Sequence, residues 1–269
     1  MLIRQPTTMR HLILLFVTTG LLTGCGLDLL TKREKDSDEL QGPIEVMFIG
    51  NSLTGWGDTL GHFEALANSA HIDVVVGNAA RDGVRLTEHI ESYETKAMIA
   101  ERLWDYIVLQ GSSYLIAFPD SIEVVAQPYE TLQTIIRHNS WKTRIVLFMD
   151  WAMDPMPGGN YTFSEFSQML HDGTLMLANR LKCMVAPIGW MWKRVHEERP
   201  TLELQKDEVH PNLTGGYLQA CVYFATIFQK SPVGNDYTGR LDEEVAAYLQ
   251  QTAADIVLKN RSKWRLPGS

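Results

Sequence analysis

The sequence of 269 residues is poor in cysteine and has no excess of positive charge, and each absence excludes a class of protein. Three cysteines are too few for the disulfide framework that stabilises small secreted domains. Lysine and arginine number 24 against 32 aspartates and glutamates, for a net charge of −8. This balance argues against binding to nucleic acid, and against attachment to anionic lipid by charge alone.

Several motifs of metal and nucleotide chemistry are also missing. The eight histidines are scattered, and no Cys-x-x-Cys or His-Glu-x-x-His spacing predicts a metal site. No Gly-x-Gly-x-x-Gly or Walker-type loop predicts a bound nucleotide, and the Gly-x-Ser-x-Gly elbow of one large class of α/β esterases is absent. We therefore expect neither a metal nor another cofactor.

The first segment of the chain has the pattern of an export signal. Arg4 and Arg10 precede an apolar run that ends at Leu22 and fits the core of a secretory signal. The run is shorter than the roughly 20 apolar residues that a membrane span needs. It leads into Leu-Thr-Gly-Cys25, which resembles the bacterial lipobox, whose cysteine becomes the lipid-modified first residue of the mature protein. The alternative is an ordinary signal peptide with a chance cysteine.

The lipobox resemblance implies a lipoprotein in three parts. These are a signal peptide over residues 1–24, the lipidated Cys25 with a tether over residues 25–42, and a single domain over residues 43–269. The charged segment 31–41 has almost nothing to bury, as expected of a solvated tether. Such a protein is anchored outside the cytoplasm. Gly26 is not the aspartate that retains some lipoproteins, which indicates the outer membrane if the source is Gram-negative.

After the tether, five short apolar runs alternate with longer amphipathic stretches. The runs are near-continuous in valine, isoleucine, leucine and methionine, as expected for strands that helices cover on both faces. This alternation predicts parallel strands joined by right-handed crossovers, and hence a three-layer α/β/α sandwich with a five-stranded parallel sheet of the flavodoxin type. The expected strands are 44–49, 72–76, 106–109, 145–149 and 184–188. The expected helices are 59–70, 86–102, 121–139, 163–181, 213–228 and 242–259.

Two further cysteines, Cys183 and Cys221, lie in apolar stretches of this domain. We expect them to be buried free thiols, because small apolar side chains suit such positions. A disulfide between them stays possible in an oxidising compartment.

Two distant segments carry candidate catalytic residues. An open parallel sheet binds its ligands beyond the carboxyl ends of its strands, and Gly50 and Ser52 directly follow the first expected strand. Far along the chain, Asp207 stands three residues before His210. An aspartate at this spacing can orient the imidazole, which then accepts the serine proton. Each segment alone is a weak signal of catalysis, and turn formation and helix capping explain the serine segment better.

Together, the two segments resemble the first and last sequence blocks of the SGNH (GDSL-like) hydrolases. The first is Phe-Ile-Gly-Asn-Ser-Leu-Thr, with Asn51 where many members have aspartate, and the last is Asp-x-x-His-Pro-Asn. The resemblance implies the fold predicted above and an ester hydrolase. In it, Ser52 is the nucleophile, His210 the general base, and Asp207 the residue that orients His210.

The middle blocks match that family less closely. Gly83 corresponds to the glycine whose N–H joins that of Ser52 in the oxyanion hole, although a plain turn glycine would look the same. After the third expected strand, the usual Gly-x-Asn-Asp is replaced by Gln110-Gly-Ser-Ser, which is similar to a sub-group that includes some sugar-ester esterases. The resemblance implies that Gln110 is the third oxyanion donor, with Ser112 or Ser113 as the alternative.

Candidate substrate contacts follow the strands in the same way. Asn51 is one, and Trp151 and Trp190, after the fourth and fifth expected strands, could stack on sugar rings; core packing is the plainer role of tryptophan. The resemblance favours removal of O-acetyl groups from carbohydrate at the cell envelope through an acyl-enzyme.

The expected partners are an acylated small molecule or glycan and, through the lipid anchor, a membrane, with no nucleic acid. Two alternatives remain. One is a lipase or lysophospholipase, and the other is a catalytically silent glycan-binding lipoprotein of the same fold.

Overall fold

Five parallel strands form one sheet in the computed structural model, which describes residues 42–111, 114–154 and 160–268. The strand order is β2-β1-β3-β4-β5, so that β1 lies between β2 and β3. The central strands are almost completely buried, as their apolar composition predicts. The strands are β1 (Ile44–Ile49), β2 (Val74–Asn78), β3 (Tyr106–Leu109), β4 (Arg144–Phe148) and β5 (Met184–Ala186).

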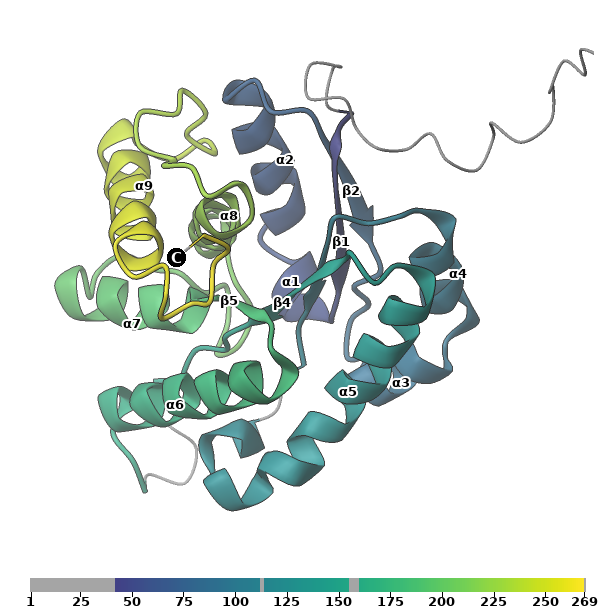
Figure 1. The fold of residues 1–269 in the computed structure, drawn as a ribbon. Helices are drawn as coiled ribbons and strands as arrows, with labels where there is room; N and C mark the ends of the chain where they lie inside the picture. The colour runs from purple at the N-terminus through teal and green to yellow at the C-terminus, as the bar shows by residue number, and fades with distance from the viewer. Residues whose placement is uncertain (1–41, 112–113, 155–159, 269) are drawn as a thin grey trace, which may run out of the picture. The chain divides into compact units, whose positions relative to one another are not determined.

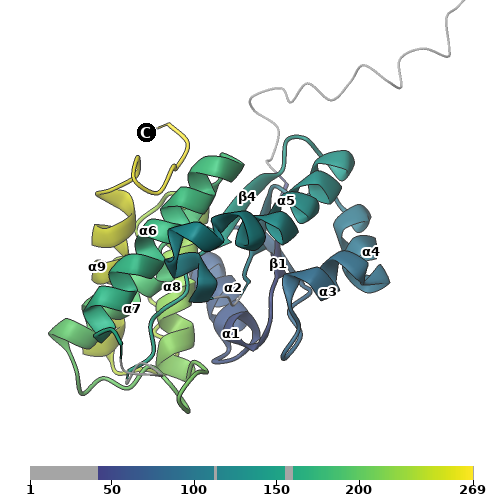
Figure 2. The same cartoon turned by 90° about the horizontal axis from the view of Figure 1, so that it is seen from below.

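Helices cover both faces of this sheet (Figures 1 and 2). One layer consists of α2 (Thr59–Ser69) and the buried α8 (Leu213–Phe228), with α9 (Glu243–Leu258) packed on α8. The other layer consists of α3 (Leu86–Glu91), α4 (Tyr93–Glu101), α5 (Ile122–Asn139) and α6 (Phe163–Leu181). The remaining helices are α1 (Ser52–Gly55), α7 (Ile188–Glu198) and the 3₁₀ turns η1 (Tyr114–Ala117) and η2 (Pro119–Ser121). The predicted three-layer sandwich with a five-stranded parallel sheet is therefore confirmed.

The larger differences from the expected elements have local causes. The helix expected over 86–102 is interrupted at Ser92, whose side chain accepts a hydrogen bond from the Thr95 N–H at 3.2 Å and so begins α4 as a separate helix. The fifth strand ends at Ala186 rather than at residue 188, because Pro187 stands before α7, a helix that the sequence analysis did not predict. Cys183 and Cys221 are buried free thiols, as expected.

The amino-terminal segment, including Cys25 and the expected tether, lies outside the described residues, as do Ser112 and Ser113. From Gly42 onward the chain forms one compact unit. No helix in the described part of the chain has both the length and the apolar character needed to span a membrane.

Two glycines let the segment after α1 touch the first turn of α8. A Cβ on Gly216 would lie 1.8 Å from the carbonyl oxygen of Gly57, and a Cβ on Gly57 would lie 2.5 Å from the carbonyl oxygen of Asn212. Gly57 also has a φ of +69°, a conformation that other residues rarely adopt. Because Ser52 and His210 each lie a few residues before one of these glycines, the contact brings the two candidate segments together.

We expect Gly216→Ala to lower the free energy of unfolding by about 1–3 kcal/mol, because the added methyl group forces the two backbones apart. Gly55→Ala is the matched control, since a Cβ there makes only an ordinary contact of 3.9 Å with Ala80. Denaturant unfolding of the two variants measures the difference. Equal stabilities would show that the contact of Gly57 with Gly216 does not constrain the fold.

Candidate active site

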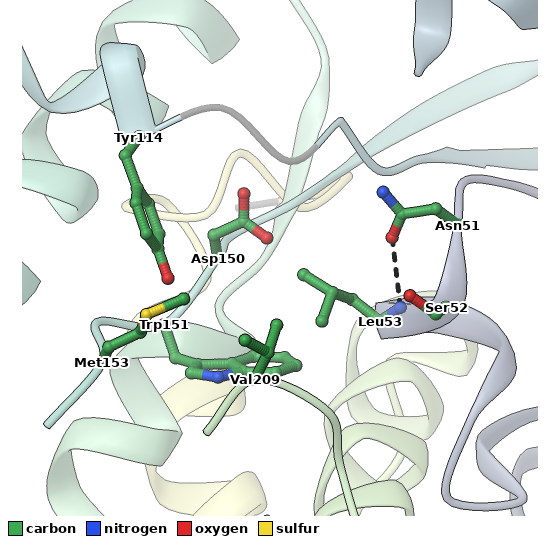
Figure 3. A pocket seen from close by; sticks show the side chains of 8 residues that line it. All are labelled: Asn51, Ser52, Leu53, Tyr114, Asp150, Trp151, Met153 and Val209. Atoms are coloured by element: carbon green, nitrogen blue, oxygen red, sulfur yellow. Dashed lines mark hydrogen bonds between the residues drawn. The ribbon is translucent and has the colours of Figure 1, made fainter. Parts of the chain in front are cut away.

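A cavity of about 220 Å³ opens at the carboxyl ends of the strands, next to Ser52 (Figure 3). This position agrees with the rule for open parallel sheets. Among the residues that the structure describes, no three His, Cys, Asp or Glu side chains are grouped so that they could hold a metal ion. The described residues that line the cavity are Asn51, Ser52, Leu53, Tyr114, Asp150, Trp151, Met153 and Val209.

The turn that carries Ser52 rests on the buried side chain of Gln110. The Gln110 Oε1 atom accepts hydrogen bonds from the Asn51 N–H at 2.7 Å and from the Thr54 hydroxyl at 3.2 Å. Only glycine fits at position 50, because a Cβ there would lie 2.5 Å from the same oxygen. The Asn51 side chain caps α1, of which Ser52 is the first residue. The turn that carries Ser52 is therefore held in place by the buried amide of Gln110.

His89 in α3 supports the same turn, although no sequence motif predicted this role. Its Nε2 atom lies 2.8 Å from the Gly50 carbonyl oxygen, and its Nδ1 atom lies 2.9 Å from the Thr95 hydroxyl. Since a carbonyl oxygen can only accept, Nε2 carries the proton and Nδ1 accepts from Thr95. Burial lowers the pKa of His89, which favours this neutral form. No local pattern marks the residue, because its role depends on a contact with a distant strand end.

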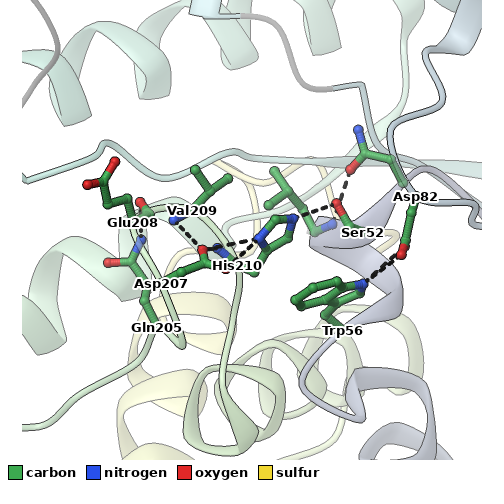
Figure 4. Close-up of polar contacts among 10 residues, drawn as sticks. Ser52, Trp56, Asp82, Gln205, Asp207, Glu208, Val209 and His210 are labelled. Carbon is green, nitrogen blue, oxygen red and sulfur yellow. Dashed lines mark hydrogen bonds and ion pairs between the residues drawn. The ribbon is translucent and has the colours of Figure 1, made fainter.

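Ser52, His210 and Asp207 form a continuous chain of hydrogen bonds (Figure 4). The His210 Nε2 atom lies 3.0 Å from the Ser52 Oγ atom, across 158 positions of sequence. The His210 Nδ1 atom lies 2.9 Å from Oδ2 and 3.1 Å from Oδ1 of Asp207. Because a carboxylate only accepts, Nδ1 donates to Asp207 and leaves the Nε2 lone pair facing the serine hydroxyl. This is the arrangement that a general base requires.

Asp207 is held as an anion by its own loop. The backbone N–H groups of His210 and Val209 donate to it at 2.7 and 2.8 Å, and together with the His210 side chain they lower the pKa of Asp207 to about 2. A lowered pKa means that the carboxylate keeps its charge at all higher pH values. It can therefore orient His210 throughout the neutral range.

Trp56, another residue that the sequence analysis missed, lies flat against His210. The two rings stack with their centroids 4.1 Å apart and their planes inclined by 24°. The indole N–H donates to the Asp82 carboxylate at 3.0 Å, which fixes the ring, and the Lys206 amine lies 4.7 Å from the ring centroid. Trp56 limits the positions that the imidazole can take, and its π face can stabilise a protonated imidazole. The signal in the sequence was an aromatic residue four positions after Ser52.

The structure places the remaining oxyanion candidates less directly. Gly83 lies in an exposed turn with a φ of +71°, one residue after Asp82, and a Cβ there would meet nothing within 4 Å. The Gln110 Oε1 atom accepts from the turn that carries Ser52, and the NH₂ group of the same amide is the donor. The oxyanion roles of Ser52, Gly83 and Gln110 therefore stay predictions.

The two predicted tryptophan contacts have different outcomes. Trp151 is almost completely buried, lines the cavity and stacks on Trp192, with centroids 4.1 Å apart and planes inclined by 6°. Trp190 does not line the cavity: its ring packs on His171 at 4.5 Å and also contacts Lys263. The prediction for Trp190 is corrected for a helical reason. Residues two apart on a helix do not share a face, and in α7 it is Trp192 that turns towards Trp151.

Fold and site together define an α/β protein with a serine–histidine–aspartate group at the carboxyl edge of its sheet. A DUF4886 family protein from Bacteroides uniformis is similar, with 20% identity and a TM-score of 0.71 over 80% of this chain and 95% of that chain. A candidate SGNH hydrolase from Slackia heliotrinireducens has 21% identity and a TM-score of 0.55 over 69% of this chain and 100% of its own.

An acetyl xylan esterase is also similar, with 14% identity and a TM-score of 0.54 over 68% of this chain and 100% of that chain. No family model and no curated protein matches the sequence. The chain therefore has the fold of the SGNH hydrolases, as the two sequence blocks indicated.

We expect Trp56→Leu to slow the labelling of Ser52 by a fluorophosphonate by roughly tenfold, within the range of a lost cation–π contact. Trp56→Phe keeps a flat ring and should stay within about threefold of the native rate. Trp141→Leu, at a 73% exposed tryptophan, is the control and should have no effect. A native labelling rate in Trp56→Leu would exclude the stacking contact as a support for His210.

Proposed function

We propose that the protein is a serine ester hydrolase that works through an acyl-enzyme. The observation that carries the proposal is the hydrogen-bonded chain from the Ser52 Oγ atom through the His210 imidazole to the Asp207 carboxylate. The solved structures of the same fold support it, since they include a candidate SGNH hydrolase and an acetyl xylan esterase.

The reaction follows from the positions of the three side chains. Ser52 Oγ attacks the ester carbonyl while His210 Nε2 takes its proton, and Asp207 stabilises the imidazolium that forms. Collapse of the tetrahedral intermediate releases the alcohol, which receives this proton from His210. A water molecule then attacks the acyl-enzyme while His210 Nε2 takes its proton. The second tetrahedral intermediate releases the acid, and the proton passes from His210 to Ser52 Oγ, which restores the starting state.

In this proposal the oxyanion is held by N–H donors around Ser52. As the first residue of α1, Ser52 has an N–H without an acceptor inside the helix. The amide NH₂ of Gln110 and the backbone N–H of Gly83 are the other assigned donors, by resemblance to the family. Loss of one such donor typically costs about 10²–10³ in rate.

For the substrate we propose an O-acetylated carbohydrate. The cavity of about 220 Å³ beside Ser52 is small against the roughly 300–1,000 Å³ of common ligand pockets, so that beside the alcohol half of an ester it leaves room only for a short acyl group. The acetyl xylan esterase with this fold acts on an ester of that class. We further propose that Cys25 carries the lipid anchor, so that the protein acts at the cell envelope.

We expect Ser52→Ala to abolish hydrolysis of p-nitrophenyl acetate, because the variant lacks the hydroxyl group that forms the acyl-enzyme in this proposal. Ser167→Ala, at a buried serine of α6, is the control and should retain activity. A fluorophosphonate should label the native protein and leave Ser52→Ala unlabelled. Hydrolysis by Ser52→Ala at the native rate, or a native protein that is neither active nor labelled, would contradict the proposal.

A second candidate function, hydrolysis of esters with a longer acyl chain, is favoured by one observation. A largely apolar groove of about 280 Å³ shares Asn51 with the cavity, so that it adjoins the candidate nucleophile. Its described lining includes Leu86, Leu115, Val124, Val125, Pro128 and Tyr129.

Acyl-chain selectivity separates the two candidates. We expect kcat/KM to fall at least tenfold from p-nitrophenyl acetate to p-nitrophenyl octanoate, because the small cavity has no room for a long acyl chain beside the alcohol half. Val124→Asp places a charge at the mouth of the groove, where Val124 is 68% exposed. A preference for octanoate that Val124→Asp removes would favour the second candidate instead.

A further inference from the structure

A carboxylate is built into the wall of the cavity beside Ser52, and the proposed mechanism does not use it. Asp150 follows β4 and is only 7% exposed. Figure 3 shows its side chain pointing into the cavity, between Tyr114 and Asn51. Burial of a carboxylate costs free energy, so a buried carboxylate in a cavity wall is a candidate for a role in binding or catalysis.

The start of α7 packs directly against the backbone of Asp150. A Cβ on Gly189 would lie 1.9 Å from the Asp150 carbonyl oxygen, so that the helix start and the turn after β4 are in direct contact. The Gly189 N–H also donates to the Met149 carbonyl oxygen at 2.8 Å. On the other side of Asp150, Trp151 is stacked on Trp192. These contacts hold the backbone of Asp150 and Trp151 in a defined position, and a wall that is ordered before binding lowers the entropy cost of binding.

The electrostatics of the cavity favour a substrate with hydrogen-bond donors. Burial raises the pKa of Tyr114, and the negative charge of Asp150 raises it further, so that the Tyr114 phenol keeps its proton. No cation stands among the described residues that line the cavity. An acetyl or alkyl group has no donor to offer a carboxylate, whereas the hydroxyl groups of a sugar do.

We propose that Asp150 is a specificity-determining residue that accepts hydrogen bonds from hydroxyl groups on the alcohol half of the ester. The inference rests on the proposed ester hydrolase function and assigns to one residue the preference for esters of polyhydroxylated alcohols, such as carbohydrate esters. A hydrogen bond to a charged acceptor is among the stronger ones, and a site built to hold a hydroxyl group discriminates strongly against an analogue without it. Aryl and simple alkyl esters lack these donors.

Two acetate esters that differ only in their alcohol half test this inference on the full-length protein. A mono-O-acetylated methyl xyloside offers free hydroxyl groups next to the ester, and p-nitrophenyl acetate offers none. We expect Asp150→Asn to lower kcat/KM for the xyloside about tenfold more than for p-nitrophenyl acetate. Asp150→Ala, which removes both acceptor oxygens, should widen this difference to about 100-fold.

Asp154→Asn is the matched control, since Asp154 lies in the same loop but is exposed and pairs with His196 at 3.2 Å. It should keep both activities within about twofold. Equal losses on the two esters in the Asp150 variants, or no loss on either, would overturn the inference. So would a native protein that hydrolyses p-nitrophenyl acetate but not the xyloside, which would leave the ester hydrolase intact. A native protein inactive on both esters and unlabelled by a fluorophosphonate would instead refute the proposed function itself.

Discussion

The candidate site depends on one close approach of backbone to backbone, between Gly57 and Gly216. The segments that carry Ser52 and His210 lie far apart in the sequence, and each consists of a turn followed by a helix. The contact between the two glycines sets the distance between these turns, and the 3.0 Å separation of the Ser52 Oγ and His210 Nε2 atoms follows from it. Gln110 and His89 then fix the serine turn from below, so that its position relies on buried neutral groups.

Two aspartates near Ser52 have different proposed roles because their environments differ. Asp207 is half exposed and receives two backbone N–H groups, which stabilise its charge beside His210. Asp150 is buried in the cavity wall, where its charge faces the space that a substrate would occupy. In the proposed reaction the first acts on the imidazole and the second on the alcohol that leaves.

Much of the fold could be predicted from the sequence, because buried parallel strands produce short apolar runs that are visible locally. The triad residues could be paired across the chain, since the ends of parallel strands meet at one edge and the two blocks resemble a known pattern. Trp56 and His89 were missed, because stacking on His210 and bonding to Gly50 are long-range contacts. For Trp56 the sequence offers only an aromatic residue four positions after Ser52, and for His89 it offers no local pattern. Trp190 was predicted at the site because helix α7 was not predicted. The geometry of this helix turns the Trp190 ring away from the cavity.

The direction of β1 has a practical consequence. The chain enters the sheet at Ile44, and Ser52 lies just beyond the other end of the same strand. Six residues of extended chain span roughly 20 Å. A solid support or a fusion partner joined ahead of Gly42 would therefore attach at the amino-terminal end of β1, opposite the cavity. The mouth of the cavity would stay open to a bulky polymer.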